Sequence, residues 1–154
     1  MHLYLASDHA GFALKQELVL FLRTAGHEVI DMGPAAFAQD DDYPLYCTPC
    51  AQKVAADAGS FGIVVGHSGQ GEAMAANRVM GARAAVYYGG SDEVLLLSRQ
   101  HNNANILSLG AQFVPPESAK HAVALWLATP FSGGERHLRR IGQLDDLHDT
   151  VCTR

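Results

Sequence analysis

Short apolar runs alternate along the chain with longer segments in which apolar residues recur every three or four positions. In residues 12–25, the apolar positions include Leu14, Leu18 and Leu22, and charged or amide side chains fill the opposite face. This spacing predicts an amphipathic helix, and Gly26 is expected to cap its C-terminal end. Further helices are predicted over 46–58, 70–78, 92–100, 116–128 and about 135–148, the last including Ile141, Leu144 and Leu147.

One apolar run precedes each of the first five predicted helices. The runs are short and do not alternate apolar with polar residues, which is typical of strands buried on both faces of a parallel sheet. Because strand and helix follow each other five times, we expect an α/β protein with three layers, α/β/α, and a five-stranded parallel sheet. No repeat or linker interrupts this order, so residues 1–154 are expected to form a single domain. The predicted strands are 2–6, 28–32, 61–65, 83–87 and 105–109.

Composition restricts the class of protein further. With 48% hydrophobic and 18% charged residues, the chain resembles an ordered globular domain rather than a disordered segment. Its formal net charge of −5 argues against a surface that binds nucleic acid. No apolar run approaches the ~20 residues of a membrane span, and the first residues lack the basic-then-apolar order of a signal peptide. We therefore expect a cytoplasmic protein that binds neither nucleic acid nor a membrane.

The three cysteines, an odd number, do not suggest a disulfide framework. Cys47 and Cys50 have the C-x-x-C spacing of redox and zinc sites, but they fall at the start of a predicted helix, without a second pair of ligands. We expect both to be small buried side chains. Neither a metal site nor a cofactor is predicted.

The residues after the third predicted strand are the richest in candidate chemistry, and ligands of parallel sheets bind beyond the carboxyl ends of strands. The segment is GHSGQGE, residues 66–72. Gly66 and Gly71 have the spacing of a P-loop, but Glu72 stands where a P-loop has its lysine and would repel a triphosphate. Gly69 and Gly71 begin a dinucleotide-binding pattern, but that pattern needs a small residue at position 74, where this chain has Met74. Both nucleotide interpretations are therefore disfavoured.

Two other interpretations give this loop a catalytic role. Ser68 lies between a strand and a helix, as in a nucleophile elbow, although Gln70 replaces the last glycine of that motif. A serine hydrolase that uses Ser68 is therefore an alternative function. Glu72 could instead take a proton from carbon while the backbone N–H groups of residues 68–72 stabilise the oxyanion that forms. The simplest explanation, an acidic residue favoured in a first helical turn, also remains open.

Two further polar clusters lie at the ends of predicted elements. Asp8 and His9 follow the first strand, either as a helix-capping turn with Ser7 or Asp8 as the cap, or as a carboxylate–imidazole pair. His101 and Asn102 follow a helix and lead back to a strand. Asparagine is common in such turns, and histidine is suited to moving protons near neutral pH.

Arg136 and Arg140 are four residues apart in the last predicted helix and share one face. Two guanidinium groups on one face suit a phosphate monoester, and a solvated basic face is the alternative. Together these clusters resemble the ribose-5-phosphate isomerase B family, which includes galactose-6-phosphate isomerase subunits. The resemblance runs from Leu3 to about Leu147. The motifs that carry it are SDHAGFALK (7–15), DYP (42–44), GHSGQGEAMAANR (66–78), SRQHNNAN (98–105) and RHLRR (136–140).

The resemblance implies a Rossmann-like fold and metal-free aldose–ketose isomerisation of a phosphosugar. It also implies homodimers, or tetramers, whose active sites use residues of both subunits, and we expect the C-terminal helix at the dimer interface. In one branch of the family, a cysteine at the end of the third strand acts as the base, and Gly66 stands at that position here. The other branch carries a glutamate at the position of Glu72. The resemblance therefore selects Glu72 as the base.

Roles for the other candidates follow from the same resemblance. His101, helped by Asp8, is expected to open the furanose ring, after which Glu72 moves a proton between C2 and C1. Ser68 and the loop amides are expected to hold the enediolate. Substrate contacts are expected from His9, Arg136 and Arg140 at the phosphate, from Tyr43 and Asn102 at hydroxyls, and from the loop residues Gly66, His67, Gly69 and Gly71.

Two positions depart from the family pattern. Gln112 stands where members usually carry an arginine that helps bind phosphate, a contact worth ~1.5–3 kcal/mol. His67 stands where a glycine is usual. Ribose 5-phosphate remains the expected substrate, and the Gln112 change leaves galactose 6-phosphate, allose 6-phosphate and erythrose or erythrulose 4-phosphate as alternatives. A non-catalytic phosphosugar-binding module is a further class, but the joint presence of Asp8, Glu72 and His101 argues against it.

Overall fold

The computed structural model describes the backbone of residues 1–151 and the side chains of residues 1–146. Its centre is a sheet made of β1 (His2–Ser7), β2 (Glu28–Asp31), β3 (Phe61–Gly66), β4 (Ala84–Tyr87) and β5 (Ile106–Gly110). All paired strands are parallel, and their order is β2-β1-β3-β5-β4. In the middle strand, β3, Val65 lies opposite Ser7 of β1, and Gly66 lies opposite Gly110 of β5. The predicted five-stranded parallel sheet is confirmed.

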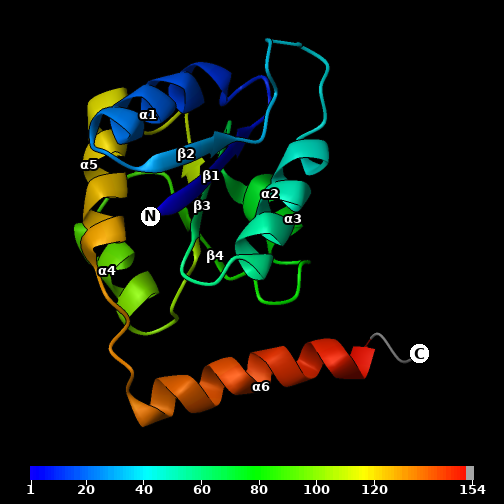
Figure 1. The fold of residues 1–154 in the computed structure, drawn as a ribbon, viewed down its shortest axis with the longest axis vertical. Coiled ribbons are helices and arrows are strands. Elements are labelled where there is room, and N and C mark those ends of the chain that lie inside the picture. The colour runs from blue at the N-terminus through cyan, green and yellow to red at the C-terminus, as the bar shows by residue number, and fades with distance from the viewer. Residues whose placement is uncertain (152–154) are drawn as a thin grey trace.

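The described residues form six helices: α1 (Phe12–Thr24), α2 (Pro44–Ala56), α3 (Gln70–Ala76), α4 (Asp92–Gln100), α5 (Pro116–Ala128) and α6 (Glu135–Val151). Helices α1, α4 and α5 cover one face of the sheet, while α2 and α3 cover the other (Figure 1). This arrangement is the predicted three-layer α/β/α fold. Helix α6 lies outside these layers, across one end of the molecule (Figure 1). None of the helices in the described part of the chain is long and apolar enough to cross a bilayer.

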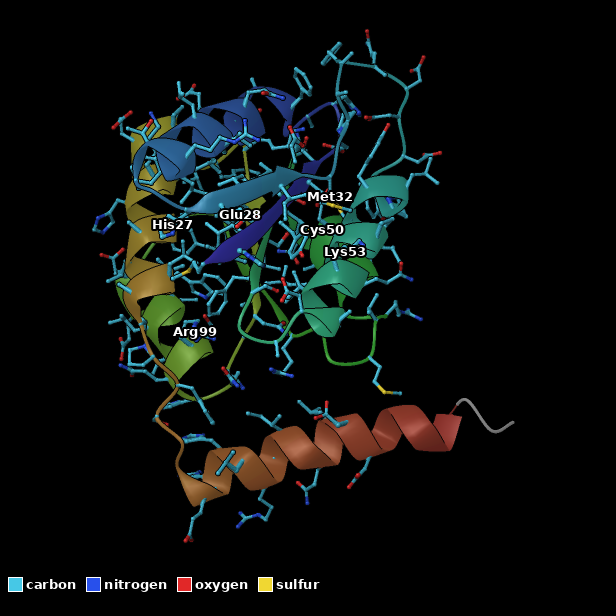
Figure 2. All side chains as sticks on the ribbon, in the orientation of Figure 1. His27, Glu28, Met32, Cys50, Lys53 and Arg99 are labelled. Carbon is cyan, nitrogen blue, oxygen red and sulfur yellow. The ribbon has the colours of Figure 1, made fainter. Side chains whose placement is uncertain are left out.

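The two faces of the sheet bury different side chains, because neighbouring residues of a strand point to opposite faces. On one face, Leu3 and Leu5 pack with Trp126 of α5, which has no exposed surface. On the other face, Tyr4 packs with Cys50 of α2, and Figure 2 shows Cys50 between α2 and the sheet. Since both faces are covered, the strands are apolar throughout, which explains the unbroken apolar runs in the sequence.

Cys47 and Cys50 are buried free thiols. Burial raises the pKa of the Cys50 thiol to about 12, so that it stays protonated at neutral pH. Its Sγ lies 3.5 Å from the carbonyl oxygen of Tyr4, to which it donates. These observations confirm that both cysteines are small side chains of the core.

Some helix and strand ends differ from the predicted ones. Helix α2 spans Pro44–Ala56 rather than 46–58, because Pro44 fits a first helical turn, where its missing N–H would have no helical partner. Helix α3 ends at Ala76, β4 begins one residue later than predicted, and β5 extends to Gly110. After α1, Gly26 has a φ of +85° and its N–H donates to the carbonyl of Arg23, as expected of a C-terminal cap.

The predicted side-chain cap of α1 is wrong. Gly11, not Ser7 or Asp8, occupies the N-cap position, and no side chain caps the helix. Asp8 Oδ1 instead accepts a hydrogen bond from the N–H of Gly11 at 3.0 Å, which stabilises the turn that leads into α1. A Cβ at position 11 would overlap the carbonyl of Val65, so only glycine allows this turn to pack against the end of β3.

Helix α6 presents apolar side chains that the chain itself does not cover. Leu138 and Leu144 are 54% and 56% exposed, and Ile141 between them is half-buried. Spaced three residues apart, these side chains share one side of the helix. The Leu147 side chain, counted in the predicted helix, lies outside the described residues. This apolar stripe of α6, residues 138, 141 and 144, is not part of the core.

Candidate active site

Three segments meet at the carboxyl end of the central strands. They are the turn after β1, residues 8–11, the loop between β2 and α2, residues 32–43, and the segment that links β3 to α3, residues 66–72. Gly11 of the first packs against the end of β3, and His9 hydrogen bonds to Asp41 of the second. Figure 1 shows the second segment as the loop at the top of the view. This edge is where ligands of parallel sheets bind.

Glu72 lies in the first turn of α3 and is 4% exposed. Its carboxylate lies directly against Gly66, since a Cβ at position 66 would overlap both carboxylate oxygens. Burial raises the pKa of Glu72, the negative charge of Asp8 adds to this effect, and the backbone N–H of Glu72 itself opposes it. A buried carboxylate with a raised pKa is a stronger base, once ionised, than an exposed one. Glu72 therefore has the properties of a proton acceptor.

Hydrogen bonds to β5 and the residues after it hold the 66–72 segment in place. Ser108 Oγ donates to the carbonyl of Gly69 at 2.6 Å, and the N–H of Gln112 donates to the carbonyl of His67 at 3.1 Å. Gly69 has a φ of +76°, and a Cβ there would lie 3.0 Å from the backbone of Leu109. Within the described residues, no acceptor faces the N–H of Ser68 or of Gly69. These N–H groups remain free to bind a ligand oxygen.

Ser68 is half-buried in this segment, and its Oγ accepts a hydrogen bond from the N–H of Gln70 at 3.3 Å. None of the described histidine rings hydrogen bonds to Ser68. A hydrolase needs a base on the serine hydroxyl, so the nucleophile-elbow hypothesis gains no support from the structure.

His9 is paired with a carboxylate, but not with the predicted one. Its ring Nδ1 lies 2.8 Å from Oδ1 of Asp41, and the same oxygen accepts from the backbone N–H of His9 at 2.9 Å. Asp8 cannot take this role with its Oδ1, which is bound to the N–H of Gly11. The predicted pairing of Asp8 with His9 is therefore wrong, and Asp41 is the carboxylate that binds the imidazole.

Tyr43 lies against the helix that carries Glu72. A Cβ at Gly71 would be 2.7 Å from the Tyr43 ring and 2.9 Å from its hydroxyl. The phenol therefore covers Gly71 closely, one residue before Glu72. Tyr43 therefore lies beside the 66–72 segment, and its contact with a bound substrate stays a prediction.

His67 is exposed and lies edge-on against Phe113, with ring centroids 6.1 Å apart. Phe113 also contacts Tyr88, with ring centroids 6.4 Å apart. Gln112, the residue before Phe113, joins this cluster through its N–H, which donates to the carbonyl of His67. The charge of His67 lowers the pKa of Glu72, but this effect is smaller than those of burial, the Glu72 backbone N–H and Asp8.

A second cluster of expected site residues forms around the end of α4. The His101 ring stacks on His137 of α6, with ring centroids 4.3 Å apart and planes 12° from parallel. Ser132 fixes the segment before α6 to α4, because its N–H and Oγ both donate to the carbonyl of Gln100, at 3.2 and 2.6 Å. Burial lowers the pKa of His137, and His101, Arg136 and Arg140 add to this effect. The structure thus brings His101 together with the α6 arginines.

Arg99, labelled in Figure 2, anchors the loop that carries His101 and Asn102. It is 5% exposed, and its guanidinium donates to the carbonyls of Thr129 and Ala104 and to the side chain of Asn103. Asn102 lines a cavity of about 480 Å³ that also includes Leu144 and Asp145 of α6. The loop that carries His101 and Asn102 is therefore held in place by the buried Arg99.

The two clusters lie at opposite edges of the sheet. Glu72 follows the carboxyl end of β3, whereas His101 follows the C-terminal end of α4, which leads to the amino end of β5. In a parallel sheet, each connecting helix starts at one edge and ends at the other. One chain therefore does not bring Asp8 and Glu72 together with His101, Asn102, Arg136 and Arg140.

Comparison with known proteins identifies the family. Residues 3–144 match the model of the family described as Ribose/Galactose Isomerase. The chain belongs to this family. It is 43% identical over 150 residues to ribose-5-phosphate isomerase B of Mycobacterium tuberculosis, which covers 97% of this chain and 91% of the relative. It is also similar to a crystal structure of ribose-5-phosphate isomerase B from Mycoplasma genitalium with bound ribulose 5-phosphate, with 37% identity, 96% of both chains covered and a TM-score of 0.90.

A third similar structure is that of ribose-5-phosphate isomerase B from Clostridium thermocellum, with 38% identity, a TM-score of 0.92, and 98% and 99% of the two chains covered. Any Cβ at position 66 would overlap the carboxylate of Glu72, so the buried position of this carboxylate requires glycine there.

The structure reveals two residues at these clusters that sequence reasoning missed. Asp41, the carboxylate bound to His9, is one of three consecutive aspartates, 40–42, and the sequence contains no sign of which one faces the site. Arg99 belongs to the SRQHNNAN motif, but its function as an anchor depends on the carbonyl groups that surround it in the fold.

Proposed function

We propose that the protein interconverts ribose 5-phosphate and ribulose 5-phosphate by moving a proton between C2 and C1. The observation that carries this proposal is the buried Glu72 carboxylate, which lies against Gly66 at the carboxyl end of the middle strand. Its raised pKa suits a base that must remove a weakly acidic proton. The named activity of the similar Mycobacterium tuberculosis protein and the ligand of the Mycoplasma genitalium structure support this substrate.

The proposed reaction begins when the furanose ring opens, with His101 moving the proton and Asp8 assisting. Glu72 then takes the proton from C2, the electron pair forms the C1–C2 double bond, and the carbonyl oxygen becomes an oxyanion. The free N–H groups of Ser68 and Gly69 suit this oxyanion. Glu72 returns the proton to C1 while the hydroxyl proton of O2 moves to O1, which completes the ketose.

We propose that each active site forms between two protomers. The carboxyl edge of one chain supplies Asp8, His9, Tyr43 and Glu72, and the α4–α6 region of a second chain supplies the residues around His101. In this arrangement the two clusters, which lie apart within one chain, come together from two chains. The apolar stripe of α6, residues 138, 141 and 144, supports an interface there, because half-exposed leucines gain from being covered.

We assign the phosphate to His9 of one protomer and to Arg136 and Arg140 of the other. The two arginines are exposed in a single chain, on consecutive turns of α6. Guanidinium groups bind phosphate oxygens in pairs, and a cationic imidazole adds a further donor. Tyr43 and Asn102 are assigned to sugar hydroxyls.

Deuterium exchange tests the role of Glu72. In D₂O, the parent protein is expected to place solvent deuterium at C1 of ribulose 5-phosphate, whereas Glu72→Gln should lose about 10²–10⁴-fold in kcat. Glu93→Gln is the matched control, because Glu93 also lies in a first helical turn but is exposed. If Glu72→Gln exchanges and turns over like the parent, the base assignment is wrong.

A substrate screen tests the choice of sugar. Four-, five- and six-carbon aldose phosphates are offered separately, and the ketose product is identified by NMR. We expect the highest kcat/KM for ribose 5-phosphate; a higher value for galactose 6-phosphate, allose 6-phosphate or erythrose 4-phosphate would contradict the proposal. A fluorophosphonate probe is expected to leave Ser68 unlabelled, and labelling would instead support a serine hydrolase.

A further inference from the structure

One carboxylate oxygen of Asp41 makes two hydrogen bonds, both with His9. Its Oδ1 accepts from the backbone N–H of His9 at 2.9 Å and lies 2.8 Å from the ring Nδ1. The Asp41 side chain is 5% exposed, and its Oδ2 is buried without a hydrogen-bond partner among the described residues. A buried carboxylate oxygen without a donor is unfavourable unless a nearby positive charge compensates it. His9 is the group placed to provide that charge.

The geometry also determines which ring nitrogen of His9 is available. A carboxylate can only accept, so Nδ1 of His9 carries the hydrogen in this pair. Nε2 then remains for a ligand, and it has no hydrogen-bond partner among the described residues. Phe37, from the same loop as Asp41, lies edge-on to the imidazole with ring centroids 6.5 Å apart. The loop between β2 and α2 therefore holds the ring by a hydrogen bond and by an aromatic contact.

The charged groups that face His9 are carboxylates. The hydrogen bond to Asp41 raises the pKa of His9 above its ordinary value of 6.5, the charges of Asp8 and Asp40 raise it further, and burial opposes them. The cation of the neighbouring helix, Lys15, is held by Asp31. His9 therefore keeps its positive charge to a higher pH than an exposed histidine does.

We propose that Asp41 is a positioning residue for phosphate binding, because it holds the His9 imidazolium with Nε2–H directed at the phosphate of the substrate. This inference rests on the proposed function and deepens it by naming the residue that determines the tautomer and charge of His9. At this edge the Lys15 cation is held by Asp31, whereas Nε2 of His9 has no hydrogen-bond partner among the described residues.

NMR of the histidine rings tests the first half of the proposal without any substrate. In the parent protein, the ¹⁵N shifts of His9, assigned with a His9→Gln variant, are expected to show a protonated Nδ1 at every pH. The pKa of His9 is expected to fall toward 6.5 in Asp41→Asn, which keeps the accepting oxygen but removes the charge. Asp40→Asn, a neighbouring exposed carboxylate, is the matched control and should change it much less. An unprotonated Nδ1 in the parent overturns the proposal even if Asp41→Asn does not fold.

Binding measurements test the second half. At pH 7.5, Asp41→Asn is expected to weaken inorganic phosphate binding and to raise KM for ribose 5-phosphate about tenfold, with kcat changed less than about twofold. If the pKa of His9 falls but phosphate binds as in the parent, the role in phosphate binding is wrong. Inorganic phosphate is the probe because its binding is measured independently of turnover. Failure of the proposed isomerisation would therefore be distinguished from failure of this inference.

Discussion

The carboxylate of Glu72 fills the space where a side chain at Gly66 would lie. We therefore expect Gly66→Ala to displace Glu72 and to remove activity nearly completely, although no reacting group is changed. The new methyl group would meet a buried carboxylate at the end of a fully paired strand, where neither can move easily. Steady-state kinetics with ribose 5-phosphate and urea unfolding measure the two effects.

A double-mutant cycle tests whether overlap with the Glu72 carboxylate is what destabilises Gly66→Ala. Gly66→Ala alone is expected to destabilise the fold by about 1–3 kcal/mol, and adding Glu72→Ala should recover most of that loss because it removes the overlapping atoms. The double variant should remain inactive. Additive destabilisation by the two substitutions would show that Gly66 is needed for another reason.

Glu72→Gln is expected to increase stability at neutral pH while removing activity. Burial raises the pKa of Glu72, so the folded state disfavours the ionised form. The ionised carboxylate therefore reduces the free energy of unfolding above the folded pKa, and this penalty disappears as pH falls below the ordinary value of 4.5. Thermal unfolding of both proteins between pH 4 and 8 measures the difference, which should be largest at pH 7–8. A stability gain that is equal at pH 4 and pH 8 would show that ionisation is not its cause.

Much of the fold could be predicted because it depends on patterns that are local in the sequence. Strands buried on both faces leave unbroken apolar runs, and α1 leaves helical spacing around Leu14 and Leu18. The pairing of His9 with Asp41 could not be predicted. The two residues are 32 positions apart, and three consecutive aspartates offer equivalent carboxylates until the path of the loop places one of them.

The sequence already indicates that the expected site residues fall into two separate clusters. His101 follows a predicted helix, whereas Glu72 follows a predicted strand, and these ends lie at opposite edges of a parallel sheet. The resemblance placed both residues in one site, whereas a single chain of this fold holds them at opposite edges of the sheet. The stacking of His101 on His137 could not be predicted, because it depends on the segment that directs α6 away from the layers.

Lys15→Met is expected to loosen the loop that carries Asp41 and Tyr43. Lys15 has no exposed surface, and its Nζ donates to Asp31 Oδ1 at 2.6 Å and to the carbonyl of Pro34 at 2.8 Å. Removing the cation leaves both oxygens without this donor. We expect a loss of about 3 kcal/mol, the lower end for a broken buried ion pair, because the Asp31 side chain is 25% exposed.

Urea unfolding measures the loss in Lys15→Met, and hydrogen exchange of residues 32–43 measures the loosening of the loop. The exposed Lys53, labelled in Figure 2, provides the control variant Lys53→Met, for which neither quantity should change by more than a few tenths of a kcal/mol. Unchanged protection of residues 32–43 in Lys15→Met would mean that the ion pair stabilises the sheet without ordering the loop.

Mixing two inactive variants tests whether the site is shared between protomers. Glu72→Gln removes a residue of the carboxyl-edge cluster, and His101→Asn removes one of the α4–α6 cluster, so each variant alone should have little activity. A mixed dimer contains one site with both defects and one site with neither. If subunits exchange at random, half of the dimers are mixed, and about a quarter of the parent activity should return. Sedimentation analysis checks that dimers form, and a mixture of Glu72→Gln with Glu72→Ala is the control that should stay inactive. Recovery no greater than in this control would show that each chain acts with its own residues alone.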